Sequence, residues 1–293
     1  MKTKVVYVLT SNGHDNYAAM LCLSLYTLRR RNRDADVLVV MDAQTHEALQ
    51  KQASPIFTYA KPIIVDIPGE YNVLQQSRYL KTTLRMIIEG DFLFLDCDTL
   101  IAEKLDEIDL VQSSLAFVED LNGPSIVCCF FSYTNELAKR AGFLEPDNEP
   151  YFNSGVMFVR DTPLNRRFFA MWHECWKKSL VNGVPQDQPA LIEANRLLDH
   201  PIQKLPGIYN CQFGLYHIFT YYKLFFVKAK VLHYYSKFNF AKWRIITIAL
   251  DRVKARGYVD FFTSVLMRYP RIVIYDLHFS LFRWKIKKKF GID

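Results

Sequence analysis

The segment Phe92–Leu95, followed directly by Asp96, Cys97 and Asp98, constrains the fold of this 293-residue chain more than any other. A short run of large apolar residues is typical of a strand buried on both faces of a parallel sheet. If the backbone stays extended through Cys97, Asp96 and Asp98 point to the same side, because side chains two residues apart share a face. The segment therefore predicts a pair of carboxylates at the carboxyl end of a central strand.

Paired carboxylates at this position favour a divalent-cation site. Open α/β sheets bind ligands beyond the carboxyl ends of their strands, and hard oxygen ligands suit Mg²⁺ or Mn²⁺. The alternative is a solvated turn, in which aspartate is common without any ligand. Asp-x-Asp is a short and frequent pattern, so the triplet alone does not decide between the two interpretations.

The first hundred residues alternate between strand-like and helix-like segments, which is the pattern of a doubly wound sheet. The expected strands are residues 5–9, 37–41, 63–67 and 91–95, and the expected helices are 17–31, 45–52 and 77–89. The turn after the first strand has neither the Gly-x-Gly-x-x-Gly fingerprint nor a Walker lysine, so no dinucleotide or P-loop phosphate site is indicated. Its polar residues suit hydrogen bonds to a base or ribose.

The pattern is less regular after residue 98. The expected strands are 115–118, 125–131, 156–160 and 227–234, with one helix at 165–180. A change of pattern near Trp243 divides the chain into a main domain, 1–243, and a basic amphipathic helical C-terminal appendage, 244–293. The dipeptide Tyr269-Pro270 is expected to separate two helices of that appendage.

The charge pattern points to a membrane surface rather than to nucleic acid. The formal net charge is +7, and the basic excess gathers late in the chain without any nucleic-acid-binding motif. Residues 281–290 interleave Trp, Phe, Leu and Ile with a lysine cluster, which suits an anionic headgroup layer. A solvated basic helix is the alternative.

The cysteines and the amino terminus predict the compartment. The six cysteines include no Cys-x-x-Cys pair, and the amino terminus lacks the features of a secretory signal. No stretch reaches the roughly 18 uncharged apolar residues of a membrane span. We therefore expect a cytoplasmic protein that is peripheral on the inner face of the cytoplasmic membrane.

Five separated segments, taken in order, resemble those of glycosyltransferase family 8, the glycogenin-like and lipopolysaccharide galactosyltransferase-like enzymes. The segments are Asp15–Ala19, Ser77–Lys81 followed by Phe94–Thr99, Tyr151–Met157, Gln186–Ala190, and His233. The resemblance spans about residues 5–243. It implies an α/β fold of the glycosyltransferase A type, a Rossmann-like mixed sheet with an Asp-x-Asp motif, to which the chain adds a small helical membrane-docking appendage.

The resemblance also implies an activity. It is the metal-dependent transfer of a hexose, galactose or glucose, from a UDP-sugar to lipopolysaccharide, capsule or another surface glycan or glycolipid acceptor, with retention of configuration. Two other functions stay open: a nucleotidyltransferase, for which the expected glycine-rich phosphate loop is absent, and a non-catalytic membrane-associated protein that binds nucleotide sugars.

The matching positions imply the site residues. The implied ligands of Mn²⁺, with Mg²⁺ as the alternative, are Asp96, Asp98 and His233, and an imidazole beside two carboxylates suits Mn²⁺ somewhat better. The catalytic candidates are Asp187, Gln188 and Asn153. The positions expected to bind the UDP-sugar are Thr10, Asn16, Tyr17, Arg78, Lys81, Cys97, Asp120, Gly155, Lys237 and Lys242.

Some of these assignments have local alternatives. Asn153 and Gly155 also suit a tight turn before a strand at 156–160, and Asp187 also suits the cap of a helix that has Pro189 in its first turn. Glu119 competes with Asp120 for contact with the donor sugar.

The basic residues are also ambiguous. The helix residue that faces the sugar nucleotide is either Arg78 or Lys81. The family's Gly-x-x-Lys-Pro-Trp segment after the metal histidine is absent here, so either Lys237 or Lys242 is expected to grip the diphosphate. Lys242 is preferred because Trp243 follows it, as in the family.

Overall fold

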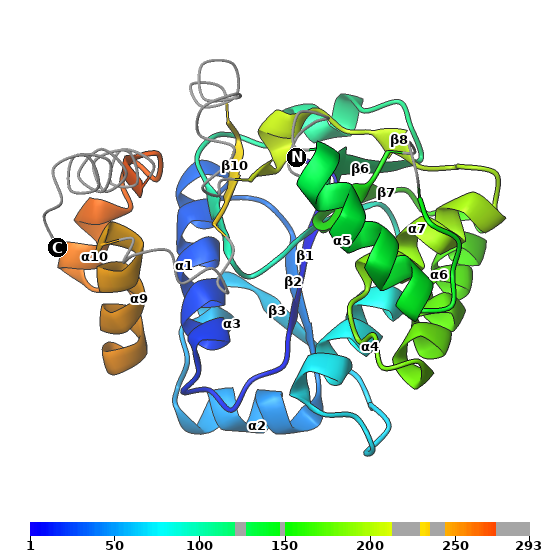
Figure 1. Ribbon diagram of the computed structural model, residues 1–293. Helices are drawn as coiled ribbons and strands as arrows, with labels where there is room; N and C mark the ends of the chain where they lie inside the picture. The colour runs from blue at the N-terminus through cyan, green and yellow to red at the C-terminus, as the bar shows by residue number, and fades with distance from the viewer. Residues whose placement is uncertain (121–126, 147–149, 213–228, 235–243, 274–293) are drawn as a thin grey trace, which may run out of the picture.

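The computed structural model describes residues 1–120, 127–146, 150–212, 229–234 and 244–273, and its main element is a seven-stranded sheet (Figure 1). The strand order is β3-β2-β1-β4-β7-β6-β8. The strands β3, β2, β1 and β4 are parallel to one another, whereas β7 runs antiparallel between β4 and β6. The bounds are β1 Lys4–Leu9, β2 Val37–Met41, β3 Lys61–Ile64, β4 Phe92–Leu95, β6 Leu115–Glu119, β7 Phe152–Val159 and β8 Gln203–Lys204. The expected mixed α/β sheet is therefore confirmed.

A second, three-stranded sheet has the order β5-β10-β9. Its strands are β5 Thr99–Ile101, β10 Val231–His233 and β9 Cys211–Gln212. The antiparallel pairing of β10 with β5 places His233 opposite Thr99. This register brings the end of the chain's last described strand to the residue that follows the Asp-x-Asp motif.

Helices cover both faces of the main sheet (Figure 1). They are α1 Asn16–Arg31, α2 Ala43–Lys51, α3 Ile56–Tyr59, α4 Val73–Ile87, α5 Val127–Arg140, α6 Pro163–Val181, α7 Gln188–Leu197, α9 Arg244–Arg256 and α10 Phe261–Leu266. Short 3-10 helices occupy Asp106–Leu110 (η1) and Gly207–Tyr209 (η4).

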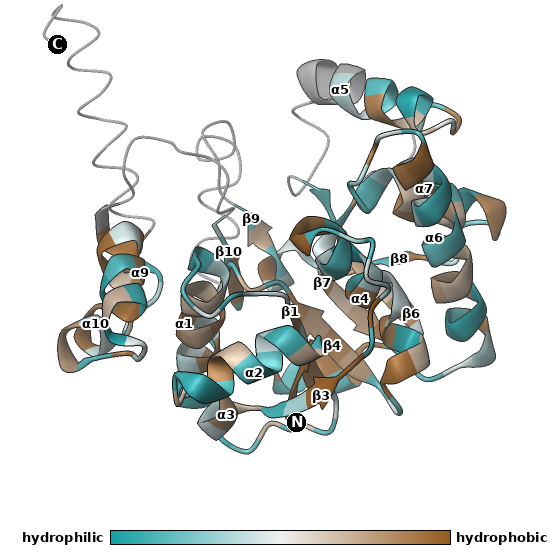
Figure 2. Cartoon of the chain, turned by 90° about the horizontal axis from the view of Figure 1, so that it is seen from below, coloured by the Kyte–Doolittle hydropathy of each residue, from teal (hydrophilic) through white to brown (hydrophobic). Residues whose placement is uncertain are grey.

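Alternation along β1 divides the core into two layers. Val5, Tyr7 and Leu9 belong to the layer that contains α1 and α9, and Val6 and Val8 belong to the layer that contains α4 and α6. This is the period-2 pattern of a strand that is covered on both sides. Figure 2 shows the same strands coloured as hydrophobic between more polar helices.

Several sequence-based expectations are corrected at their boundaries. The structure begins α4 at Val73 rather than at residue 77, because Asn72 forms a capping box with Gln75. The strand expected at 63–67 is β3, Lys61–Ile64, where pairing with β2 fixes its extent. Within the expected strand 227–234 only Val231–His233 is a strand, and residues 227 and 228 lie outside the described part.

The strand expected at 125–131 is wrong. Its apolar residues from Val127 onward form the first turns of α5, which continues to Arg140. Leu137, Ala138 and Ala141 are buried at helical spacing in the core layer of α4 and α6. Packing of this later face therefore overrides the strand-like composition of the first residues.

The part of the chain after residue 243 begins by packing on the main core. Ile246, Ala249 and Val253 of α9 are buried in the layer that contains α1, and α9 lies beside α1 in Figure 1. The turn at Tyr269-Pro270 follows α10 and precedes two helical residues, 272 and 273. Residues 281–290 lie outside the described part. Among the described helices, none has both the length and the apolar character needed to cross a bilayer.

Candidate active site

Two strand pairings assemble the candidate metal ligands. The backbone N–H of Asp96 donates to the carbonyl of Gly155 on β7 at 2.8 Å, and the N–H of Tyr234 donates to the carbonyl of Asp98 at 3.1 Å. As a result, one ligand atom from each of Asp96, Asp98 and His233 lies within 4.8 Å of the others. Asp96 and His233 are 137 positions apart in the sequence, yet the triad occupies one end of β4.

The expectation that an extended backbone through Cys97 brings Asp96 and Asp98 together is wrong. The strand β4 ends at Leu95, and Cys97 and Asp98 form a turn instead of continuing the extended backbone. The hydroxyl of Thr99 closes that turn by donating to the carbonyl of Asp96 at 2.8 Å. The turn therefore brings the two carboxylates together, and not the alternation of a strand.

Gly155 leaves the space in which these ligand side chains meet. A Cβ at this position would lie 2.5 Å from Cε1 of His233, 2.8 Å from Oδ1 of Asn153 and 2.9 Å from Oδ2 of Asp96. Gly155 and Asn153 lie inside β7, so the alternative of a tight turn before residue 156 is wrong. Glycine is required here by close approach, because any side chain would displace the histidine and the carboxylate.

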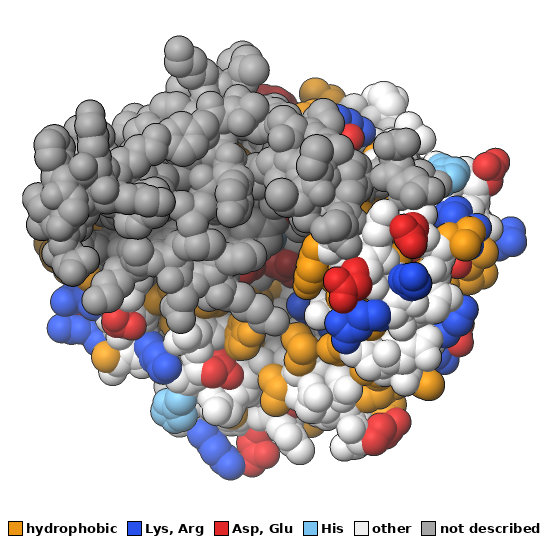
Figure 3. All heavy atoms as spheres, in the orientation of Figure 1, with side chains coloured by type: hydrophobic (Ala, Val, Ile, Leu, Met, Phe, Trp, Pro, Cys, Tyr) orange, Lys and Arg blue, Asp and Glu red, His pale blue; other side chains and the backbone are white. Residues whose placement is uncertain are grey.

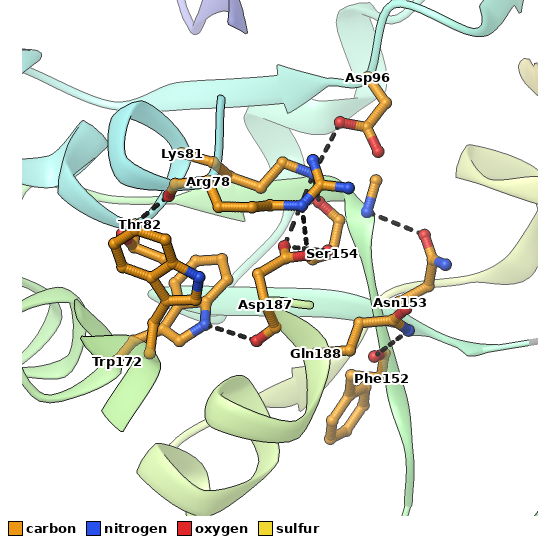
Figure 4. Close-up of polar contacts among 12 residues, drawn as sticks. Arg78, Lys81, Thr82, Asp96, Phe152, Asn153, Ser154, Trp172, Asp187 and Gln188 are labelled. Atoms are coloured by element: carbon orange, nitrogen blue, oxygen red, sulfur yellow. Dashed lines mark hydrogen bonds and ion pairs between the residues drawn. The ribbon is translucent and has the colours of Figure 1, made fainter. Parts of the chain in front are cut away.

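Cations and carboxylates alternate beside the metal triad (Figure 4). The Nζ of Lys81 lies 2.7 Å from Oδ1 of Asp96 and 3.7 Å from Oδ2 of Asp187, and Nε of Arg78 lies 3.0 Å from Oδ1 of Asp187. The hydroxyl of Ser154 donates to Oδ2 of Asp187 at 2.7 Å. Trp172 of α6 adds a hydrogen bond from its indole to the backbone carbonyl of Asp187 at 3.0 Å.

The side-chain amides of Gln188 and Asn153 meet at the carboxylate of Asp120. Gln188 donates to Oδ2 of Asp120 at 2.8 Å and to the carbonyl of Phe152 at 3.2 Å. Asn153 donates to Oδ1 of Asp120 at 3.0 Å. Asp120, rather than Glu119, therefore contacts the other candidate residues, and Glu119 forms an ion pair with Lys204 of β8.

Burial and neighbouring charges shift the pKa values of this site. Burial alone would raise the pKa of Asp187, but Arg78 and Lys81 lower it to about 2. Burial alone would lower the pKa of His233, yet the adjacent carboxylate of Asp98 raises it above the ordinary value. Burial, reinforced by Asp96 and Asp98, raises the pKa of Cys97 well above the ordinary value, so this thiol is neutral and not a nucleophile.

These groups share a pocket of about 600 Å³. Its lining includes most of the candidate residues, namely Thr10, Tyr17, Arg78, Lys81, Asp96, Cys97, Asp98, Asn153, Asp187, Gln188 and His233. Gly155 and Asp120 do not line the pocket but contact residues that do. Gly155 lies against His233 and Asp96, and Asp120 accepts hydrogen bonds from Asn153 and Gln188. On the face drawn in Figure 3, the described part of the surface has acidic and basic side chains interspersed.

Besides Gly155 and Asp120, Asn16 is a described candidate that does not line the pocket. Asn16 lies in the first turn of α1, where its Oδ1 accepts a hydrogen bond from Lys254 of α9 at 3.2 Å. Lys237 and Lys242 lie outside the described residues. Their assignment to the diphosphate stays a prediction.

The structure adds five polar residues that the sequence reasoning did not single out. Ser77, Ser154, Gln186 and Tyr133 line the pocket, and Asn210 contacts Nδ1 of His233. Ser77, Ser154 and Gln186 lie inside segments used for the resemblance, so their position in the sequence was a usable signal. Asn210 precedes a two-residue strand and matches no motif.

Comparison with known proteins agrees with this geometry. A sequence model described as glycosyl transferase family 8 matches residues 9–243. A search of curated proteins finds no match.

Solved structures share the fold at low sequence identity. The galactosyltransferase LgtC in complex with donor and acceptor sugar analogues has a TM-score of 0.57 and 21% identity, covering 87% of this chain and 95% of that one. Mouse xyloside xylosyltransferase 1 in its apo form has a TM-score of 0.53 and 14% identity, covering 80% and 98%. The apo glycosyltransferase GlyE of Streptococcus pneumoniae TIGR4 has a TM-score of 0.56 and 18% identity, covering 93% and 64%.

These likenesses show the α/β glycosyltransferase A-type fold. The family match extends over most of the chain and includes every lining residue of the described pocket except Val8. The chain therefore belongs to glycosyltransferase family 8.

Proposed function

We propose that this enzyme is a retaining, metal-dependent hexosyltransferase that moves galactose or glucose from a UDP-sugar to lipopolysaccharide, capsule or another surface glycan. One observation carries the proposal: the candidate metal triad and the polar residues Asn153, Asp187 and Gln188 line one pocket. The activity of LgtC as a galactosyltransferase supports a hexose donor. The two domains, 1–243 and 244–293, remain part of the proposal.

The residues present fit a divalent cation. Two carboxylates and one imidazole are the donor set that suits Mn²⁺ somewhat better than Mg²⁺. Gly155 keeps free the space in which their atoms converge, since a Cβ there would touch both His233 and Asp96. When bound, the cation would neutralise negative charge on the diphosphate as it leaves.

The chain's own residues meet both charges that develop in the reaction. Negative charge grows on the leaving diphosphate, and Arg78 lines the pocket with a guanidinium that suits phosphate oxygens. Positive charge grows at the anomeric carbon. Gln188 donates its amide hydrogens to Asp120 and Phe152, so its carbonyl oxygen is the group that it offers to that centre.

The C-terminal appendage is proposed to attach the enzyme to an anionic membrane surface, which would place it at the cytoplasmic face where a lipid-linked acceptor is presented. The basic and aromatic residues of 281–290 support this proposal. Vesicle binding by the full chain is its direct test.

The function is tested by measuring UDP release from a panel of UDP-sugars with Mn²⁺, with and without a chelator. We expect chelator-sensitive release from one hexose donor. Asp98→Asn should abolish this release with the fold intact, and Asp161→Asn, an acidic residue outside the pocket lining, should not. Mn²⁺-dependent UDP binding without turnover, even with acceptor glycans present, would favour the non-catalytic alternative, and absence of UDP binding would contradict the proposal.

A further inference from the structure

We propose that Asn210 is a positioning residue that holds the imidazole of His233 with its hydrogen on Nδ1 and with Nε2 directed at the carboxylates. Asn210 is fully buried and lies between η4 and β9. Its Oδ1 lies 2.9 Å from Nδ1 of His233, and its Nδ2 donates to Oδ1 of Asn153 at 2.8 Å. The inference rests on the metal site of the proposed function.

The orientation of both amides follows from their partners. Oδ1 of Asn153 accepts the backbone N–H of Gly155 at 2.8 Å, and a backbone N–H can only donate. Nδ2 of Asn153 therefore faces Asp120, to which it donates at 3.0 Å. The group of Asn210 that meets Oδ1 of Asn153 must then be its NH₂, so its carbonyl oxygen faces His233.

This orientation decides which nitrogen of His233 carries hydrogen. A carbonyl oxygen only accepts, so the hydrogen between Asn210 and His233 belongs to Nδ1. The other nitrogen, Nε2, lies 3.1 Å from Oδ1 of Asp98 and is the atom that His233 directs toward the carboxylates of the metal triad. The tautomer with a lone pair on Nε2 is the one that a cation requires.

The contact between Asp98 and Nε2 of His233 explains why Asn210 is needed. Asp98 alone would attract the single hydrogen of a neutral ring to Nε2, which would remove the lone pair from the metal side. The amide chain opposes this, because reversing Asn210 would oppose its carbonyl to that of Asn153. Reversing Asn153 as well would direct its NH₂ at the N–H of Gly155.

The test is Mn²⁺ affinity, measured by the electron paramagnetic resonance signal of free Mn²⁺ in the absence of sugar donor. Asn210→Leu keeps the side-chain size but loses the acceptor, so the Kd for Mn²⁺ should rise about 10- to 100-fold. Asn210→Asp keeps an acceptor for Nδ1–H, and in this fully buried position its protonated carboxyl can still donate to Oδ1 of Asn153, so its Kd should stay within about threefold of wild type. The leucine substitution should change the Kd little in a His233→Ala background, because its effect passes through the imidazole.

A matched control is available in α7. Asn195 is also buried, lies 3.3 Å from Nδ1 of His200 through its amide nitrogen, and accepts the N–H of Ile202 at 3.1 Å, but does not line the pocket. Asn195→Leu should lower stability without changing the Kd for Mn²⁺.

The outcomes separate the inference from the proposed function. A folded Asn210→Leu variant with wild-type affinity, or an equal loss in the His233→Ala background, would overturn the inference alone. If the leucine variant does not fold, the aspartate variant decides, because a loss of more than about tenfold there contradicts an acceptor role. Absence of Mn²⁺ binding by wild type would overturn the metal site and the inference together.

Discussion

Replacing Asp187 by asparagine should destabilise the enzyme measurably, because its carboxylate compensates two cations in a buried position. The side chain is 6% exposed and pairs with Arg78 at 3.0 Å and with Lys81 at 3.7 Å. Holding its pKa at about 2 instead of 3.8 corresponds to about 2 kcal/mol of stability at neutral pH. This value already includes the lost attraction to Arg78 and Lys81, so we expect a total loss of about 2 kcal/mol.

The pH dependence of the stability difference provides a second test of this prediction. Because the folded-state pKa of Asp187 lies below the unfolded value, its contribution is complete above about pH 4 and is lost as the pH falls toward 2. The stability gap between wild type and Asp187→Asn should therefore be constant from pH 7 to about pH 5 and shrink to about half near pH 3.

Urea denaturation followed by tryptophan fluorescence measures this gap, and Trp172, which donates to the backbone carbonyl of Asp187, is a local reporter. Asp161→Asn is the matched control, since Asp161 also pairs with two arginines, Arg85 and Arg166, but is 25% exposed. Its substitution should have a much smaller effect. Equal losses for the two variants, or no loss for Asp187→Asn at pH 7, would refute the charge-compensation argument.

Two further predictions concern the metal site and the appendage. Gly155→Ala should weaken Mn²⁺ binding at least about tenfold, since the new Cβ would meet His233 and Asp96, whereas Gly69→Ala, with open space around it, should leave the affinity unchanged; equal Kd values would contradict the role of the glycine. Deleting residues from about 270 onward should release the protein from anionic vesicles while sparing donor hydrolysis in a coupled UDP assay, and equal vesicle binding by the shortened chain would disprove the membrane role of the tail.

The sequence predicted those parts of the fold that local pattern determines. The strand 37–41 and the carboxyl end of β4 are correct because apolar runs and turn residues bound them directly. The strand expected at 125–131 failed because a few apolar residues fit either structure, and the burial of Leu137 and Ala141 decides for a helix. Such packing partners are distant in sequence and leave no local signal.

The site shows the same division. Family motifs identified Asp96, Asp98 and His233, and the structure explains their meeting by the pairing of β10 with β5. Asn210 could not be found in this way, because its contacts with His233 and Asn153 depend on where a two-residue strand lies. A single asparagine between short elements carries no periodicity and no motif.

The ambiguity between Arg78 and Lys81 shows what only burial can decide. The two residues lie three positions apart on α4, so both project toward the same side of the helix and the sequence treats them alike. The side chain of Lys81 is 2% exposed and is enclosed by Asp96 and Asp187, whereas that of Arg78 is 24% exposed. A diphosphate that enters the pocket therefore meets the guanidinium of Arg78 first. We infer that Lys81 acts on the carboxylates instead, holding Asp96 and Asp187 in place when the pocket is empty.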